Sequence, residues 1–205
     1  GTGLVVWRMR EGGVRAPAPL LELGLSDREG LDLVQVLMRT LRTQGAVGAL
    51  PRVDLRNVIF EPRLGPIYVR KTGSDKNRKV LSWLPTRGKN RRSEYLSKVI
   101  AAVGAAGDPE GLLSGIWAML TNPNSAFAHW LVTSSPGAIG TVSQLDPTSI
   151  EAIAVDDSTS MWRCTVCRRI SAFNVREVCE TYRCSGRLQK WTAPTIDDDH
   201  YRALY

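Results

Sequence analysis

The sequence contains no run approaching the roughly 20 consecutive apolar residues that a membrane-spanning helix requires. Its first apolar stretch, Gly3 to Trp7, is far too short for the core of a secretory signal, and no basic residue precedes it. We therefore expect a cytoplasmic protein that neither crosses nor enters a membrane.

Catalytic motifs are also scarce. With only two histidines, a Ser-His-Asp or Cys-His site has little to draw on. The Gly88-Lys89 pair is followed by Asn90, and no glycine stands five residues before Gly88, so it does not form a nucleotide-binding P-loop. His129 is followed by Trp130 and lacks the His-x-Glu pattern of zinc deaminases. The acidic run Asp197–His200 favours a surface loop over a nuclease site, because consecutive side chains cannot all converge on one ion. The sequence predicts no self-sufficient catalytic site.

The chain has only four cysteines, and all of them lie in one short window with the pattern C-x2-C-x11-C-x4-C. The members of this set are Cys164, Cys167, Cys179 and Cys184. Two close pairs of thiolates suit a tetrahedral Zn²⁺ ion, one pair from each knuckle, although the second spacing is longer than usual. We interpret the window as a structural zinc site.

Two other uses of the cysteines stay open at this stage. Two disulfides would suit a small secreted scaffold, but nothing at the N-terminus indicates secretion. A redox pair would not explain the second pair of cysteines, and buried reduced thiols fit poorly among the neighbouring arginines.

Positive charge is concentrated in one segment. The chain carries a net charge of +7, whereas Arg70–Arg92 alone holds nine basic residues and one acidic residue, a net charge of +8. Such a concentration favours contact with a phosphate backbone, and the alternative is a solvated surface. The predicted nucleic-acid contacts are Arg70, Lys71, Lys76, Arg78 and Lys79 in one loop, Arg87, Lys89, Arg91 and Arg92 in a second loop, and Arg168 and Arg169 between the cysteine pairs.

The remaining patterns predict an α+β protein. Ser26 and Glu29 form a capping box at the start of a helix over 27–44, and further helices are expected after Ser93 and after Asp108. Strands are expected at 4–7, 53–69, 80–84, 141–145 and 150–155. A helix followed by a hairpin is compatible with a winged-helix-like unit. The loop 134–140 suggests a boundary between a mixed domain (1–135) and a β-rich zinc domain (136–205).

The C-terminal part of the sequence carries a family resemblance. Trp162–Cys167, Cys179, Tyr182–Cys184 with Gly186 and Leu188, and His200–Tyr205 resemble a segment of bacterial superfamily-2 helicases of the DEAD/DEAH type that have a four-cysteine zinc domain. MrfA-like repair helicases and helicase components of phage-defence systems belong to this group. The resemblance implies that the four cysteines bind zinc. The ATPase motifs of the family are absent from this sequence, so ATP would be used only by motor domains outside this chain.

Three functional hypotheses follow from these patterns. The first is a DNA-binding accessory region of an ATP-dependent helicase, whose partners are DNA and the helicase motor domains. The second is a protein-interaction module of a multi-subunit phage-defence or restriction complex. The third is a free-standing zinc-dependent nuclease. The resemblance and the localised positive charge favour the first hypothesis.

Overall fold

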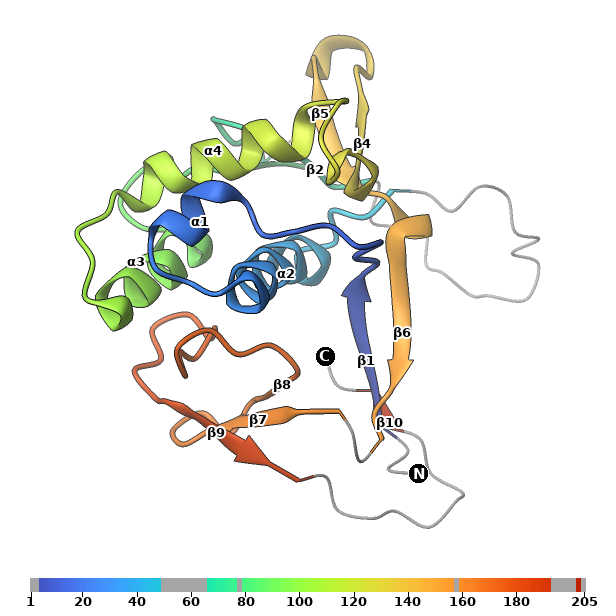
Figure 1. The fold of residues 1–205 in the computed structure, drawn as a ribbon. Coiled ribbons are helices and arrows are strands. Elements are labelled where there is room, and N and C mark those ends of the chain that lie inside the picture. Colours follow the sequence, from blue (N-terminus) through green and yellow to red (C-terminus); the bar gives the residue numbers. More distant parts are fainter. Residues whose placement is uncertain (1–3, 49–65, 77–78, 157–158, 193–201, 204–205) are drawn as a thin grey trace.

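The computed structural model describes residues 4–48, 66–76, 79–156, 159–192 and 202–203. Within these ranges a long central helix is surrounded by three further helices, a mixed sheet, an edge sheet and the cysteine-bearing loops (Figure 1). The α+β class predicted from the sequence is confirmed. None of the helices in the described ranges is long and apolar enough to cross a membrane.

The central helix, α2 (Asp27–Thr43), begins with the predicted capping box. The Ser26 side chain accepts a hydrogen bond from the backbone of Glu29, and the Glu29 carboxylate accepts one from the backbone of Ser26. Because α2 is surrounded by other elements, it buries residues around most of its circumference. The short helix α1 (Ala18–Glu22) packs against it, and Gly30 allows the segment just before α1 to approach closely, since an added Cβ would lie 2.5 Å from that of Ala16.

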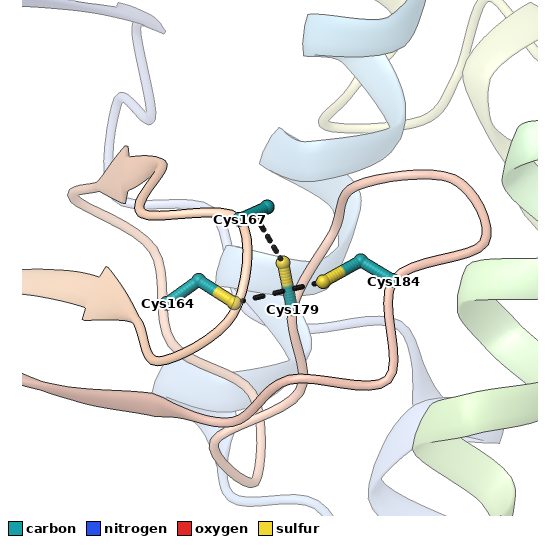
Figure 2. A group of neighbouring side chains, drawn as sticks. All are labelled: Cys164, Cys167, Cys179 and Cys184. Carbon is teal, nitrogen blue, oxygen red and sulfur yellow. Dashed lines mark hydrogen bonds between the residues drawn. The ribbon is translucent and has the colours of Figure 1, made fainter.

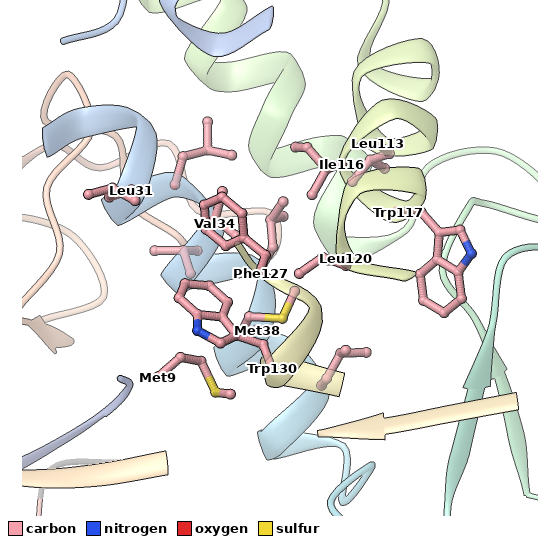
Figure 3. Packing of buried hydrophobic residues seen from close by; sticks show 14 of the residues in the cluster. Met9, Leu31, Val34, Met38, Leu113, Ile116, Trp117, Leu120, Phe127 and Trp130 are labelled. Atoms are coloured by element: carbon pink, nitrogen blue, oxygen red, sulfur yellow. The ribbon is translucent and has the colours of Figure 1, made fainter. Parts of the chain in front are cut away.

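The main core lies where α2 meets α3 (Arg91–Val103), α4 (Pro109–Thr121) and the 3-10 turn η2 (Ala128–Trp130). Figure 3 shows Met38 of α2 facing Phe127 and Trp130 from the segment after α4. The rings of Phe127 and Trp130 meet edge to face with centroids 4.9 Å apart, a favoured aromatic geometry. The Trp130 indole donates a hydrogen bond to the carbonyl of Arg10, which ties the N-terminal segment to this core.

The caps of α3 and α4 explain where these two helices begin. Asn90, rather than the predicted Ser93, caps α3. The Asn90 side chain accepts a hydrogen bond from the backbone N–H of Ser93, and the Ser93 hydroxyl accepts one from the backbone N–H of Asn90. Gly104 ends α3 in the left-handed conformation, as glycine does most easily. Asp108 caps α4 as predicted. The helix–turn–helix formed by α3 and α4 therefore has signals in the sequence at both helix starts and at the intervening turn.

A four-stranded sheet covers one end of these helices. Its strands are β2 (Tyr68–Arg70), β3 (Val80–Ser82), β4 (Leu131–Ser134) and β5 (Val142–Leu145), in the order β3-β2-β5-β4. β2 runs antiparallel to β5 and parallel to β3. β4 and β5 form a hairpin that projects beyond α4 (Figure 1) and contains the 3-10 turn η3 (Gly137–Ile139).

The order of these elements along the chain is α2, β2, β3, α3, α4, β4 and β5. A winged-helix unit consists of a helix, a strand, a helix–turn–helix and a hairpin whose second strand pairs with the strand that precedes the helix–turn–helix. The order and pairing here are the same, with β3 added at the edge of the sheet. The winged-helix-like topology is therefore present, but it is built from elements other than those first considered. The expected hairpin over 53–69 lies largely outside the described residues, and the wing is the β4–β5 hairpin.

The predicted domain boundary at 135/136 does not separate the sheets. The loop after Ser134 joins β4 to β5 within one sheet, because both strands complete the winged-helix unit. β6 (Ile150–Ala154) follows the 3-10 turn η4 (Pro147–Ser149) and pairs with β1 (Leu4–Met9) near the N-terminus. β10 (Arg202–Ala203) pairs with the other edge of β1 in parallel. The cysteine-bearing unit therefore begins after β6.

That unit contains the small sheet β8-β7-β9, formed by β7 (Met161–Cys164), β8 (Ile170–Ser171) and β9 (Leu188–Trp191). Cys164, Cys179, Cys184 and Leu188 form a small buried cluster within this unit, which is also joined to the main core. Phe173 and Val175 are buried in the same cluster as α2, and the backbone N–H of Asn174 donates to the Asp32 carboxylate on α2 at 3.0 Å. Burial, the larger influence, raises the pKa of Asp32, although this hydrogen bond and Arg28 act in the opposite direction.

Candidate metal centre and basic surface

The first pair of cysteines lies at the end of β7. Cys164 is the last residue of that strand, and the chain then turns so that the backbone N–H of Arg168 donates to the Cys164 carbonyl at 3.1 Å. The N–H of Val166 points at the Cys164 sulfur, with 3.4 Å between the nitrogen and Sγ. The turn brings the Cys167 thiol back towards Cys164, as a C-x2-C knuckle requires.

The second pair lies on the loop between β8 and β9. The N–H of Cys184 donates to the Thr181 carbonyl, and the N–H of Gly186 lies 3.4 Å from the Cys184 sulfur, so this loop repeats the arrangement of the first knuckle. The turn from Thr181 to Cys184 accommodates the longer C-x4-C spacing. Gly186 is required sterically, because an added Cβ would lie 2.5 Å from the Cys164 sulfur.

The four side chains face one another across the two loops (Figure 2). The sulfur atoms of Cys164 and Cys184 are 3.7 Å apart, those of Cys167 and Cys179 are 3.6 Å apart, and all four lie within 4.8 Å of one another. All four cysteines are free, and only Cys167 is exposed. Four converging sulfur atoms at these separations can hold one metal ion between them. The predicted clustering of Cys164, Cys167, Cys179 and Cys184 is confirmed.

Cys167 and Cys179 differ in how easily they lose a proton. Burial acts to raise the pKa of Cys167, but hydrogen bonds from the Thr181 hydroxyl and the Arg169 backbone outweigh it and lower the pKa to about 6. Burial raises the pKa of Cys179 to about 12. These environments favour the thiolate at Cys167 and the thiol at Cys179. A bound cation must displace the protons that the thiols still carry, because metals bind the thiolate form.

Lys98 on α3 connects the metal centre to the helix–turn–helix. Its ammonium nitrogen lies 2.9 Å from the Cys179 carbonyl oxygen, 3.0 Å from that of Thr181 and 3.1 Å from that of Cys184. The ammonium group thus directs its donors at three carbonyls of the second knuckle. One turn earlier on α3, the carboxylate of Glu94 accepts a hydrogen bond from the backbone N–H of Arg183 and lies 3.6 Å from the Lys98 nitrogen. Side chains of α3 therefore fix the backbone that carries Cys179 and Cys184.

A buried ion pair joins the same knuckle to α2. Glu180 pairs with Arg39 at 2.9 Å and with Arg169 at 3.1 Å, and the side chains of Glu180 and Arg39 are both only 8% exposed. The neighbouring Tyr95 is also buried, and burial raises its pKa well above the ordinary value, with the Glu180 charge acting in the same direction. Glu180 is therefore a structural link between the two knuckles and the central helix.

The two basic loops begin at the same end of the sheet. Because β2 and β3 are parallel, their following segments start side by side, and the backbone N–H of Leu84 donates to the Lys71 carbonyl at 2.9 Å. Lys71 and Lys76 are exposed on the first loop, and Arg87 and Lys89 are exposed on the second. Arg91 is exposed at the first residue of α3. Arg78 lies outside the described residues.

The cysteine-bearing unit meets the second basic loop at Tyr182. The Tyr182 hydroxyl donates to the Lys89 carbonyl at 3.4 Å, and the Arg183 guanidinium lies over the Tyr182 ring, 5.2 Å from its centroid. Arg168 is exposed on the first knuckle. The structure thus brings the C-terminal unit next to the loop that carries Arg87 and Lys89.

Several predicted phosphate contacts are not freely available. Arg92 is 3% exposed, and its guanidinium donates to the carbonyls of Ser82 and Trp83 and stacks over the Trp83 ring. The prediction that it binds DNA is wrong, because α3 begins at Arg91 and turns the next side chain into the core. Arg169 and Arg70 are half-buried, and Lys79 is partly covered at a positive φ of 53°. Arg169 is held by Glu180, and the Arg70 side chain donates to the Gly73 carbonyl.

The aromatic residues near the cysteines have separate positions. Trp162 packs against the cysteine cluster, Phe173 belongs to the main core, and Tyr182 is half-buried beside Lys89.

The sequence alone did not identify Lys98, Glu180 or Arg39 as supports of the metal centre. The spacing of Glu94 and Lys98, four residues apart on α3, was visible in the sequence, but it indicated only a helix-surface ion pair.

Comparison of the chain with models of known protein families, with curated proteins and with solved structures finds no match.

Proposed function

We propose that the metal held by the four cysteines is a structural Zn²⁺ ion. Four thiolates about 2.3 Å from a tetrahedral Zn²⁺ ion lie about 3.8 Å from one another. The sulfur–sulfur distances of 3.6 Å between Cys167 and Cys179 and 3.7 Å between Cys164 and Cys184 fit this geometry closely. Four protein ligands fill a tetrahedral shell and leave no position for a substrate, as in structural rather than catalytic zinc sites.

We further propose that the chain is a DNA-binding module. The observation that carries this proposal is the winged-helix topology with exposed basic loops next to its helix–turn–helix. In helix–turn–helix proteins the second helix enters the major groove while surrounding residues hold the backbone. Here the second helix is α4, which has no basic residue, so Lys71, Lys76, Arg87, Lys89 and Arg91 would supply the phosphate contacts.

The resemblance of the C-terminal segment to four-cysteine helicases supplies the context of this proposal. As an accessory region, the module would hold DNA while motor domains outside this chain hydrolyse ATP and translocate. The zinc would keep the second knuckle on α3 through Lys98, so the metal would support the DNA-binding surface without contacting DNA itself.

Charge reversal on the second basic loop tests the DNA proposal. The double variant Arg87→Glu/Lys89→Glu replaces two exposed side chains, and Arg15→Glu/Lys190→Glu makes the same change in charge at exposed positions outside the basic loops. Fluorescence anisotropy with a labelled short duplex and its single strand gives the affinities. We expect the loop variant to bind both more weakly, with a salt slope smaller by about 1 for each lost phosphate contact. Equal affinities of the loop and control variants would refute the proposed surface.

A further inference from the structure

A pocket of about 310 Å³ lies between α2, the start of α3 and the second knuckle. Its volume is about ten times the roughly 30 Å³ that one water occupies in the liquid, so a phosphate group fits with some of its hydration. Arg39 and Thr40 line it from α2, Arg91 from α3, and Arg169, Glu180 and Tyr182 from the C-terminal unit. Because Arg91 is exposed, the pocket can be reached from solvent.

The charges that line this pocket do not balance. Glu180 is shared by Arg39 and Arg169, so one carboxylate faces two guanidinium groups. Arg91 adds a third positive charge, and it forms no ion pair with any residue in the described part of the chain. Among the described residues that line the pocket, three arginines face one carboxylate.

Arg39 is the buried member of this set. The residue is 8% exposed, and no described atom accepts a hydrogen bond from its buried Nε. Burial lowers the pKa of Arg39; the Glu180 charge opposes this shift, and the Arg169 charge adds to it. A buried guanidinium with a spare donor and a like-charged neighbour is stabilised by a further anion, because buried charge without a full set of partners is unfavourable.

We propose that this pocket binds a phosphate group, held by Arg39 and Arg91 with Glu180 fixing the orientation of the arginines. Guanidinium groups suit this role because their planar arrangement of donors matches the oxygens of phosphate. The phosphate could belong to a nucleic-acid backbone or to a small phosphate-bearing molecule, and the chemistry of recognition is the same. The site itself does not depend on the proposed function.

Calorimetric titration of the zinc-loaded full chain with inorganic phosphate, at constant ionic strength and neutral pH, tests the site without DNA. We expect saturable binding that Arg91→Ala weakens about tenfold, the effect of losing one charge-assisted hydrogen bond. Glu180→Gln removes the one acidic side chain among the described residues that line the pocket and should tighten binding. Arg15→Ala removes an exposed charge elsewhere and should leave phosphate binding unchanged.

The opposite effects of the two pocket variants distinguish a local site from damage to the fold. Zinc content and thermal unfolding identify a variant that fails to fold, and if Glu180→Gln fails, Arg91→Ala and Arg15→Ala still give the decisive comparison. No saturable binding by the wild-type protein, or equal affinities of Arg91→Ala and Arg15→Ala, would overturn the proposal.

Competition identifies the source of the phosphate. If inorganic phosphate displaces a labelled single strand from the wild-type protein at constant ionic strength, and Arg91→Ala abolishes this competition, the pocket holds a backbone phosphate. If inorganic phosphate binds the protein but does not change its affinity for the labelled single strand, the pocket holds a small phosphate-bearing molecule. Failure of the chain to bind DNA would refute the proposed function but leave the phosphate titration intact.

Discussion

The ammonium nitrogen of Lys98 lies 2.9 Å from the carbonyl oxygen of Cys179, so a side chain of α3 holds the backbone of a candidate metal ligand. Two further carbonyls, those of Thr181 and Cys184, lie within 3.1 Å of the same nitrogen. The second knuckle is therefore attached to the winged-helix unit through one ammonium group. This arrangement makes the metal centre and the helix–turn–helix parts of one structure.

Replacing Lys98 by methionine tests this connection. The variant keeps most of the apolar length of the side chain and removes the charged donors, leaving three carbonyls without their partner. We expect the free energy of unfolding of the zinc-loaded protein to fall by about 2 to 3 kcal/mol, the range for lost hydrogen bonds to a charged group. Denaturant unfolding measures it. Lys190→Met, at an exposed position on β9, is the control. A Lys98 variant as stable as the control would contradict the connection.

Gly186→Ala tests the steric requirement at the metal centre. The added methyl group would lie 2.5 Å from the Cys164 sulfur, so the sulfur or the knuckle backbone must move. We expect weaker zinc binding, measured by competition with a chromophoric chelator. Gly115→Ala is the matched control, since an added Cβ there has no neighbour within 4 Å, and alanine should stabilise α4 by about 0.5 to 1 kcal/mol. Undiminished zinc affinity in Gly186→Ala would show that the knuckle tolerates a side chain.

Substitution of Arg92 should lower the stability of the protein, whereas substitution of its neighbour Arg91 should leave the stability almost unchanged. Arg92→Met removes a buried guanidinium that bonds the carbonyls of Ser82 and Trp83, so we expect a loss of about 2 to 4 kcal/mol in the free energy of unfolding. Arg91→Met changes an exposed side chain and should alter stability by less than about 0.5 kcal/mol. Its effect should appear in DNA affinity instead. Thermal unfolding of both variants measures the difference in stability. Equal stabilities would contradict the conclusion that the buried Arg92 side chain stabilises the fold.

Zinc affinity should increase with pH. The pKa of Cys179 is raised to about 12 and that of Cys167 lowered to about 6, so near neutral pH zinc must displace the Cys179 proton. Lowering the pH towards 6 adds competition from protons at Cys167 as well, and the apparent affinity falls. Chelator competition at pH 6 and pH 8 measures the change, and calorimetry in two buffers of different ionisation enthalpy measures the released protons. A pH-independent affinity without proton release would contradict thiolate ligation.

The sequence was sufficient for features whose determinants are local. The capping box at Ser26, the Asp108 cap and the glycine at the end of α3 each fix a helix boundary through neighbouring residues. The four cysteines were also identifiable, because their spacing within one window reflects the two turns that carry them. Metal-ligand spacing and helix capping both depend on short stretches of chain.

Features that depend on long-range packing could not be predicted in the same way. The boundary placed after residue 135 was inferred from a Gly- and Pro-containing loop, but such residues also make the turn of a hairpin, and only the pairing of β5 with β2 distinguishes the two. In the sequence Arg92 is one of many basic residues. Only the position at which α3 begins shows that the Arg92 side chain points into the core. The support of the knuckle by Lys98 joins residues more than 80 positions apart and has no local pattern.

The salt dependence of DNA binding tests the central claim most directly. Anisotropy titrations of the zinc-loaded wild-type protein with a short duplex, between about 50 and 200 mM salt, give the slope of log affinity against log salt concentration. Phosphate contacts by the basic loops predict a slope of about −0.9 for each phosphate neutralised, and a smaller slope for Arg87→Glu/Lys89→Glu. An affinity that stays constant over this range, or the absence of any DNA binding at the lower salt concentration, would contradict the account.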